Sequence, residues 1–150
     1  MQAVGRPPVI PMRTAIFSAR CEQLDAMREF VGQAAKDAGM SDDEIYSVQL
    51  AVDEACTNII EHAYGGDSEA HIECTCNAVF DSLTVILRDH GKPFDPSTVP
   101  APDLASDIKK RRVGGLGIFL MRRSMDDVSY ESLGEAGNVL TMIKRRKASK

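Results

Sequence analysis

The fold is decided by residues 41–87, where a helical spacing of apolar residues gives way to the alternation of a β-hairpin. Residues 41–66 read SDDEIYSVQLAVDEACTNIIEHAYGG, with an apolar residue at every third or fourth position. Ser41 and Glu44 form the S-x-x-E pattern of a helix N-terminus, and Gly65–Gly66 marks the end of the helix. Residues 71–87 read HIECTCNAVFDSLTVIL and alternate on both sides of a turn at Asp81–Ser82, which predicts an antiparallel hairpin.

The flanking segments supply the remaining elements. We expect a strand at Arg13–Ser18, after which Ser18 caps a helix that ends at Gly39. Beyond the hairpin we expect a helix at Ile118–Ser124 and strands at about Asp127–Ser132 and Asn138–Lys144. This order predicts an α/β two-layer sandwich with a mixed sheet. We assign residues 13–146 to one domain, between an N-terminal tail (1–12) and a basic tail (147–150).

The composition is that of an ordinary globular domain. The 150 residues are 43% hydrophobic and 27% charged, and the net charge of −4 argues against a general nucleic-acid or membrane-surface binder. No apolar run resembles an export signal or a membrane span, so we expect a cytoplasmic protein with reduced thiols. His71, Cys74 and Cys76 could suggest a metal site, but the alternation of a strand equally places both cysteines on one face.

The charges are segregated along the chain. Residues 41–87 contain ten acidic residues and no Lys or Arg, whereas residues 109–123 contain six basic residues and no acid. This pattern fits a site for a metal-bound polyanion, and it equally fits two solvated faces.

Three polar residues form a stripe on the second predicted helix. Glu54, Asn58 and His62 are spaced i, i+4 and i+8, between apolar neighbours. A carboxylate and an amide oxygen one turn apart can hold Mg²⁺, with substrate phosphates completing its shell. Alternatively, the carboxylate accepts a proton while the amide alone holds the ion, or the stripe is simply a solvated helix face.

Two further motifs come later in the chain. Asp89 and Gly91 follow a strand, where a carboxylate could bind the amino group of a base, although a plain turn has the same sequence. The run Gly114–Gly117 opens a helix and offers backbone N–H groups to phosphate, and the basic residues 109–112 precede it. It matches neither a Walker A motif nor a Rossmann fingerprint, so a simple glycine turn is the alternative.

The order of these motifs resembles that of the Bergerat-fold (GHKL-type) ATP-binding domains, and within them the anti-sigma-factor serine kinases of bacteria. Residues 54–64 (EACTNIIEHAY) are similar to the N box, residues 89–96 (DHGKPFDP) to the G1 box and residues 114–118 (GGLGI) to the G2 box. The resemblance extends from about Arg13 to Arg145 and implies a mixed, largely antiparallel sheet with helices on one face.

The resemblance also implies the roles of individual residues. Glu54 would be the general base, Asn58 would ligate Mg²⁺, and Asp89 would bind the adenine amino group. Gly91 would make room for the base, and a lid at about residues 96–113 would cover the phosphates. Asn138 stands where the family commonly has Thr near the adenine. The implied ATP- or ADP-binding set is Asn58, His62, Asp89, Gly91, Phe94, Arg111, Arg112, Gly114, Gly115, Leu116, Gly117 and Asn138.

The resemblance implies a protein-serine kinase that phosphorylates a STAS-domain anti-anti-sigma factor and sequesters a sigma factor. A homodimer is implied as well, with Arg13–Gly39 as its expected surface, whereas no direct nucleic-acid or membrane partner is expected. Two alternatives stay open: an ATP-binding partner-switch module without catalysis, and a detached histidine-kinase-type ATPase domain, against which the short chain argues.

Overall fold

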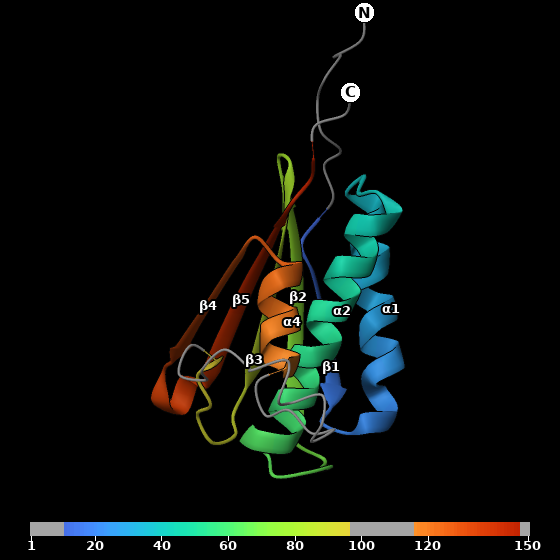
Figure 1. Ribbon diagram of the computed structural model, residues 1–150. Helices are drawn as coiled ribbons and strands as arrows, with labels where there is room; N and C mark the ends of the chain where they lie inside the picture. Colours follow the sequence, from blue (N-terminus) through green and yellow to red (C-terminus); the bar gives the residue numbers. More distant parts are fainter. Residues whose placement is uncertain (1–10, 97–115, 148–150) are drawn as a thin grey trace, which may run out of the picture.

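A computed structural model describes residues 11–96 and 116–147, which form one antiparallel sheet covered by helices (Figure 1). The strands are β1 (Arg13–Ser18), β2 (His71–Val79), β3 (Ser82–Asp89), β4 (Asp127–Ser132) and β5 (Asn138–Arg145), in the order β1-β2-β3-β5-β4. The helices α1 (Leu24–Asp37), α2 (Asp42–Asn58) and α4 (Leu116–Ser124) lie on one face of this sheet. The predicted two-layer sandwich is therefore confirmed.

The pairing of the strands is simpler than expected. All four strand pairs among the described residues are antiparallel, so the parallel pairing of a mixed sheet is not found there. The reason lies in the short connection after β4, a 3₁₀ turn η4 at Gly134–Ala136, which returns the chain as β5 between β4 and β3. β5 consequently runs opposite to both of its neighbours.

The start of the first helix differs from the prediction. Ser18 is paired with His71 as the last residue of β1, and the next residue continues the ladder through a hydrogen bond from the Ala19 N–H to the Ala70 carbonyl. Ser18 therefore ends a strand and does not cap a helix. A 3₁₀ turn, η1 (Cys21–Gln23), leads into α1 instead.

The second helix begins as predicted. The Ser41 N–H donates to Glu44 Oε1 at 2.8 Å, and the Glu44 N–H donates to Ser41 Oγ at 3.2 Å, which completes a capping box. Glu44 is buried, and its second oxygen accepts the N–H of Lys147 at 2.7 Å. The helix start is thus tied to the segment that follows β5.

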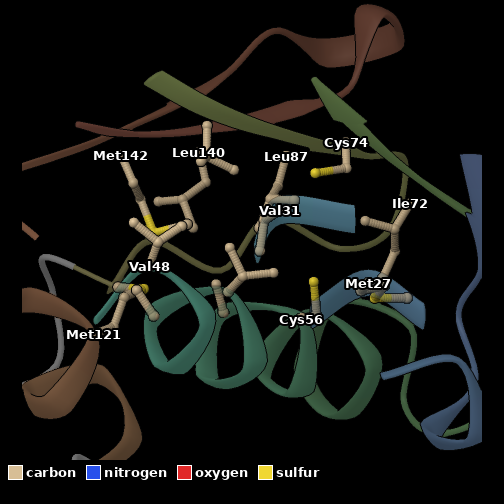
Figure 2. Close-up of a cluster of buried hydrophobic side chains, with 14 of the residues drawn as sticks. Met27, Val31, Val48, Cys56, Ile72, Cys74, Leu87, Met121, Leu140 and Met142 are labelled. Atoms are coloured by element: carbon tan, nitrogen blue, oxygen red, sulfur yellow. The ribbon is translucent and has the colours of Figure 1, made fainter. Parts of the chain in front are cut away.

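The core lies between α2 and the sheet (Figure 2). α1 and α4 flank α2, and the inward strand residues alternate as the sequence predicts. Cys74 and Cys76 are both buried on the helix-facing side, as expected of an alternating strand, together with Cys56 from α2. Fully buried residues include Met27, Val31, Val48, Cys56, Ile72, Leu87, Met121 and Met142.

Neither a cluster of metal ligands nor a membrane-spanning helix occurs among the described residues. No group of three or more His, Cys, Asp or Glu in residues 11–96 and 116–147 is arranged to hold a metal ion. Within the same residues, no helix has the length and hydropathy needed to cross a membrane.

Candidate functional site

Residues of the N and G1 boxes line a cavity at the end of α2, although Glu54, His62 and Gly91 are not part of its lining. The cavity has about 350 Å³ of empty space that opens to solvent. Asn58, Asp89 and Tyr130 supply its polar groups, and Phe94 lies beside them. Its apolar wall is formed by Ala55, Ile59, Ala63, Pro96, Met121 and Leu140. A flat, mostly apolar ring with a few polar edges is the kind of ligand that such a lining accepts.

The polar stripe on α2 is interrupted by a change of helix type. Regular α-helix ends at Asn58, and residues Ile59–Ala63 form a π-helical turn, η2, in which the Tyr64 N–H donates to the Ile59 carbonyl. A π turn has more residues than an α turn, so the i+8 spacing does not fix the direction of His62. The His62 ring is instead stacked on Phe94, with ring centroids 4.5 Å apart and planes inclined by 20°.

Glu54 lies one helical turn before Asn58 and is partly buried. Burial raises the pKa of the Glu54 carboxyl above its ordinary value, and the like charges of Asp53 and Glu61 raise it further. A Cβ atom on Gly117 would lie 2.5 Å from Glu54 Oε2, so the first turn of α4 closely approaches this carboxylate. A carboxylate with a raised pKa is a better proton acceptor than an exposed one.

Asp89 is the end of β3 and is almost fully buried, with 4% of its surface exposed. Its Oδ1 accepts the Gly91 N–H and the Asn138 Nδ2–H group, each at 2.9 Å. Asp89 also lines the cavity, so its carboxylate is available there as a hydrogen-bond acceptor. An exocyclic amino group is a donor that fits such an acceptor.

The predicted role of Gly91 is to make room for a base, but the structure gives this glycine a close contact of another kind. A Cβ atom at this position would lie 2.4 Å from the carbonyl oxygen of Ala63, and the Lys92 N–H donates to that same oxygen at 2.8 Å. The absence of a side chain therefore lets the loop after β3 pack directly onto the end of the helix.

Two tyrosine hydroxyls hold the same loop, and neither has a role that the sequence motifs predict. Tyr64 Oη accepts the His90 N–H at 2.8 Å, and Tyr130 Oη accepts the Phe94 N–H at 2.9 Å. Tyr64 also donates to the His71 carbonyl at 2.7 Å. Tyr64 falls within the N-box match, whereas nothing in the local sequence marks Tyr130, because its partner is 36 residues away.

Asn138 does not line the cavity, although the resemblance implied a direct contact between this residue and the nucleotide. It is 3% exposed, and it reaches the site through Asp89 and the Gly91 carbonyl. Arg111, Arg112, Gly114, Gly115 and the expected lid, except Pro96 at its start, lie outside the described residues. Leu116 is the first residue of α4, but its side chain is not described.

The residues present fit a magnesium-bound adenine nucleotide. The apolar wall suits a purine ring, Asp89 suits its amino group, and the Asn58 amide oxygen is a hard ligand of the type that Mg²⁺ accepts beside phosphate oxygens. Glu54 is not part of this lining, and its carboxylate lies against the first turn of α4.

Known proteins share this sequence pattern and this fold. The histidine kinase-like ATPase domain family matches residues 17–144. The serine-protein kinase RsbW of Listeria monocytogenes serovar 1/2a is 34% identical over 119 residues, which cover 77% of this chain and 76% of that protein. The RsbW of Halalkalibacterium halodurans is 31% identical over 145 residues, covering 94% of this chain and 85% of the relative.

A solved structure agrees with the fold. The crystal structure of the RsbU and RsbW domains of Rv1364c from Mycobacterium tuberculosis matches 91% of this chain with a TM-score of 0.64 and 16% identity. This chain spans 32% of that longer chain. With a family match over residues 17–144 and these curated relatives at 31% and 34% identity, the chain belongs to the histidine kinase-like ATPase domain family and, within it, to the RsbW serine-protein kinases.

Proposed function

We propose that the chain is an ATP-dependent protein-serine kinase and anti-sigma factor of a partner-switching system. Its substrate in this proposal is a serine on a STAS-domain anti-anti-sigma factor, and its other partner is a sigma factor. The observation that carries the kinase reaction is the placement of Glu54, a partly buried carboxylate one turn before Asn58 and against the first turn of α4. A domain that only binds nucleotide has no need of a proton acceptor at this point.

In this mechanism the adenine ring enters the cavity and Asp89 accepts a hydrogen bond from its amino group. The Asn58 amide oxygen would hold Mg²⁺, which neutralises charge on the phosphates when bound. Glu54 takes the proton from the serine hydroxyl as the serine oxygen forms a bond to the γ-phosphorus. The bond between that phosphorus and the β,γ-bridging oxygen breaks, and ADP is the leaving group. A positioned base of this kind contributes typically about 10²–10⁴-fold to the rate.

The test is phosphotransfer from radiolabelled ATP to a purified STAS-domain partner. We expect Glu54→Gln to reduce the labelling rate by at least about 10²-fold while ADP still binds, because the amide cannot accept the proton. Asn58→Ala should weaken nucleotide binding itself, since the Mg²⁺ ligand is lost. Glu73→Gln is the matched control, because it makes the same chemical change on β2 and its charge does not act on Glu54.

Two results would decide against the kinase. If the wild-type protein binds ATP but never labels the partner, the non-catalytic partner-switch module becomes the better account. If Glu54→Gln labels the partner as fast as Glu73→Gln does, the carboxylate is not the base. We also propose that the chain forms a homodimer through Arg13–Gly39. Size-exclusion chromatography with light scattering tests the dimer, and substitutions within that segment test its surface.

A further inference from the structure

A row of polar side chains crosses the end of the sheet beside the cavity. Asp89, Asn138 and Ser132 are direct cross-strand partners on the neighbouring strands β3, β5 and β4. Paired residues of adjacent strands point to the same face, so the three side chains can form a continuous chain of hydrogen bonds. Only the first member, Asp89, lines the cavity.

Every hydrogen-bonding group of the Asn138 amide is occupied within the protein. Nδ2 donates to Asp89 Oδ1 and to the Gly91 carbonyl oxygen, each at 2.9 Å. Oδ1 accepts from Ser132 Oγ at 2.8 Å. With one NH₂ group and one carbonyl, Asn138 therefore keeps no donor in reserve for a ligand.

The chemistry of the neighbours fixes which way the amide faces. Its Nδ2 lies against a carboxylate oxygen and a carbonyl oxygen, which are both acceptors. A flipped amide would bring a third acceptor against these two, and it would also lose the Ser132 hydroxyl as a donor. Asn138 thus supplies two fixed N–H groups at a position where an oxygen would be repelled.

The two N–H groups act on Asp89, which lines the cavity, and on Gly91, in the loop after β3. One of them holds Oδ1 of the Asp89 carboxylate, which the Gly91 N–H holds as well. No donor among the described residues bonds Oδ2 of Asp89. The other N–H holds the Gly91 carbonyl and, through it, the loop that packs on Ala63.

We propose that Asn138, oriented by Ser132, is a positioning residue that sets the base selectivity of the site. It turns one oxygen of Asp89 toward the protein and leaves the other for the exocyclic amino group of adenine. This inference rests on the proposed nucleotide-binding function and goes beyond it, because it assigns selectivity to a residue that does not touch the ligand.

The experiment compares ADP with inosine diphosphate, in which a carbonyl oxygen replaces the amino group. Affinities of both are measured by isothermal titration calorimetry in the presence of Mg²⁺ for wild type, Asn138→Asp and Ser132→Ala. Asn138→Asp keeps the size of the side chain but places an oxygen against Asp89 and the Gly91 carbonyl. Asn77→Asp is the matched control, because it makes the same change on β2, a strand that is not paired with β5, and Asn77 does not line the cavity.

We expect wild type and Asn77→Asp to prefer ADP to the same degree. Asn138→Asp should weaken ADP by about tenfold or more and bring the ratio of the two affinities toward one, because a charge-assisted hydrogen bond is lost. Ser132→Ala should lower ADP affinity by about threefold, because it removes the neutral hydrogen bond that orients Asn138 and leaves the bond between Asn138 and Asp89 in place. A general loosening of the site would weaken both nucleotides equally and leave their ratio unchanged.

The outcomes separate this inference from the proposed function. If wild type binds ADP and both variants keep the wild-type ratio, the positioning role is wrong and the ATP site stands. If Asn138→Asp does not fold, the ratio in Ser132→Ala decides by itself, because Ser132 is exposed on the edge strand. If wild type binds neither nucleotide, the proposed function fails and this inference fails with it.

Discussion

Gly91→Ala should be one of the most damaging small substitutions near the cavity. The added Cβ atom would lie 2.4 Å from the carbonyl oxygen, 2.7 Å from the carbonyl carbon and 2.9 Å from the Cβ of Ala63. Reaching ordinary contact distance requires the loop to retreat by about 1 Å, and two of these three atoms are backbone that cannot rotate away. The hydrogen bond from the Lys92 N–H to the same carbonyl, 2.8 Å long, would be lost or stretched.

The cost follows from these contacts. Overpacking costs about 1–3 kcal/mol and the hydrogen bond about 1 kcal/mol, so we expect the free energy of unfolding to fall by about 3 kcal/mol. For a domain of this size that corresponds to a loss of about 9 °C in Tm. ADP affinity should fall by about tenfold, because the same loop carries Asp89 and Phe94.

Gly32→Ala is the matched control. Its Cβ atom would also meet a neighbour at 2.4 Å, but that neighbour is Nε2 at the end of the flexible Gln49 side chain. Losing the Gln49 hydrogen bond to the Arg28 carbonyl costs about 1 kcal/mol, and replacing a helical glycine with alanine returns about as much. We expect Tm within about 2 °C of wild type and unchanged ADP affinity. Thermal denaturation and ADP titration of both variants test this, and equal effects of the two substitutions would refute the reasoning.

Three further predictions concern titratable groups. Cys21 is the one exposed thiol among the four cysteines, and a hydrogen bond to Asp67 raises its pKa. Asp67→Asn should therefore speed the reaction of Cys21 with Ellman's reagent, while the three buried thiols stay slow. An unchanged rate would contradict this. Burial disfavours the charge on Glu44, but the N–H groups of Lys147 and Ser41 keep its pKa below the ordinary value. The stabilising effect of the Glu44 carboxylate is therefore complete above the ordinary glutamate pKa and is lost as the pH falls through the pKa in the folded protein. Glu44→Gln should flatten the acid side of the curve of unfolding free energy against pH, measured by urea unfolding. Parallel curves for wild type and variant would argue against this. Glu61→Gln removes one of the charges that raise the pKa of Glu54. The acid limb of the pH–rate profile for phosphotransfer should therefore move to lower pH. Glu73→Gln, on β2, should leave this acid limb in place.

The periodic elements were predictable because their signals are local. The capping box at Ser41 and Glu44, the alternation of the β2–β3 hairpin and the final two strands appear close to the residues where the sequence places them. The boundaries that differ depend on partners elsewhere in the chain. Ser18 has the side chain of a helix cap, but pairing with His71 keeps it in the sheet.

The site was predictable as a set of motifs and not as an arrangement. The sequence order of the three boxes indicates an ATP-binding domain, and four N-box and three G1-box residues line one cavity, whereas Glu54, His62 and Gly91 do not. The π turn after Asn58, the stacking of His62 on Phe94 and the hydrogen bond from the Phe94 N–H to Tyr130 left no local signal. Each of them joins residues whose proximity exists only after the helix and the sheet have packed.

The sequence by itself determined which residues form the helices and strands, because apolar period, capping and turn chemistry act over a few neighbouring residues. It also determined the family, through motifs whose spacing follows from the elements that carry them. Only the tertiary structure decided that every described strand pair is antiparallel, that Gly91 packs against the carbonyl of Ala63, and that the Asn138 amide bonds Asp89 without lining the cavity. The Gly91 and Asn138 contacts join residues 28 and 49 positions apart, and such contacts are set by packing and register, which no local pattern encodes.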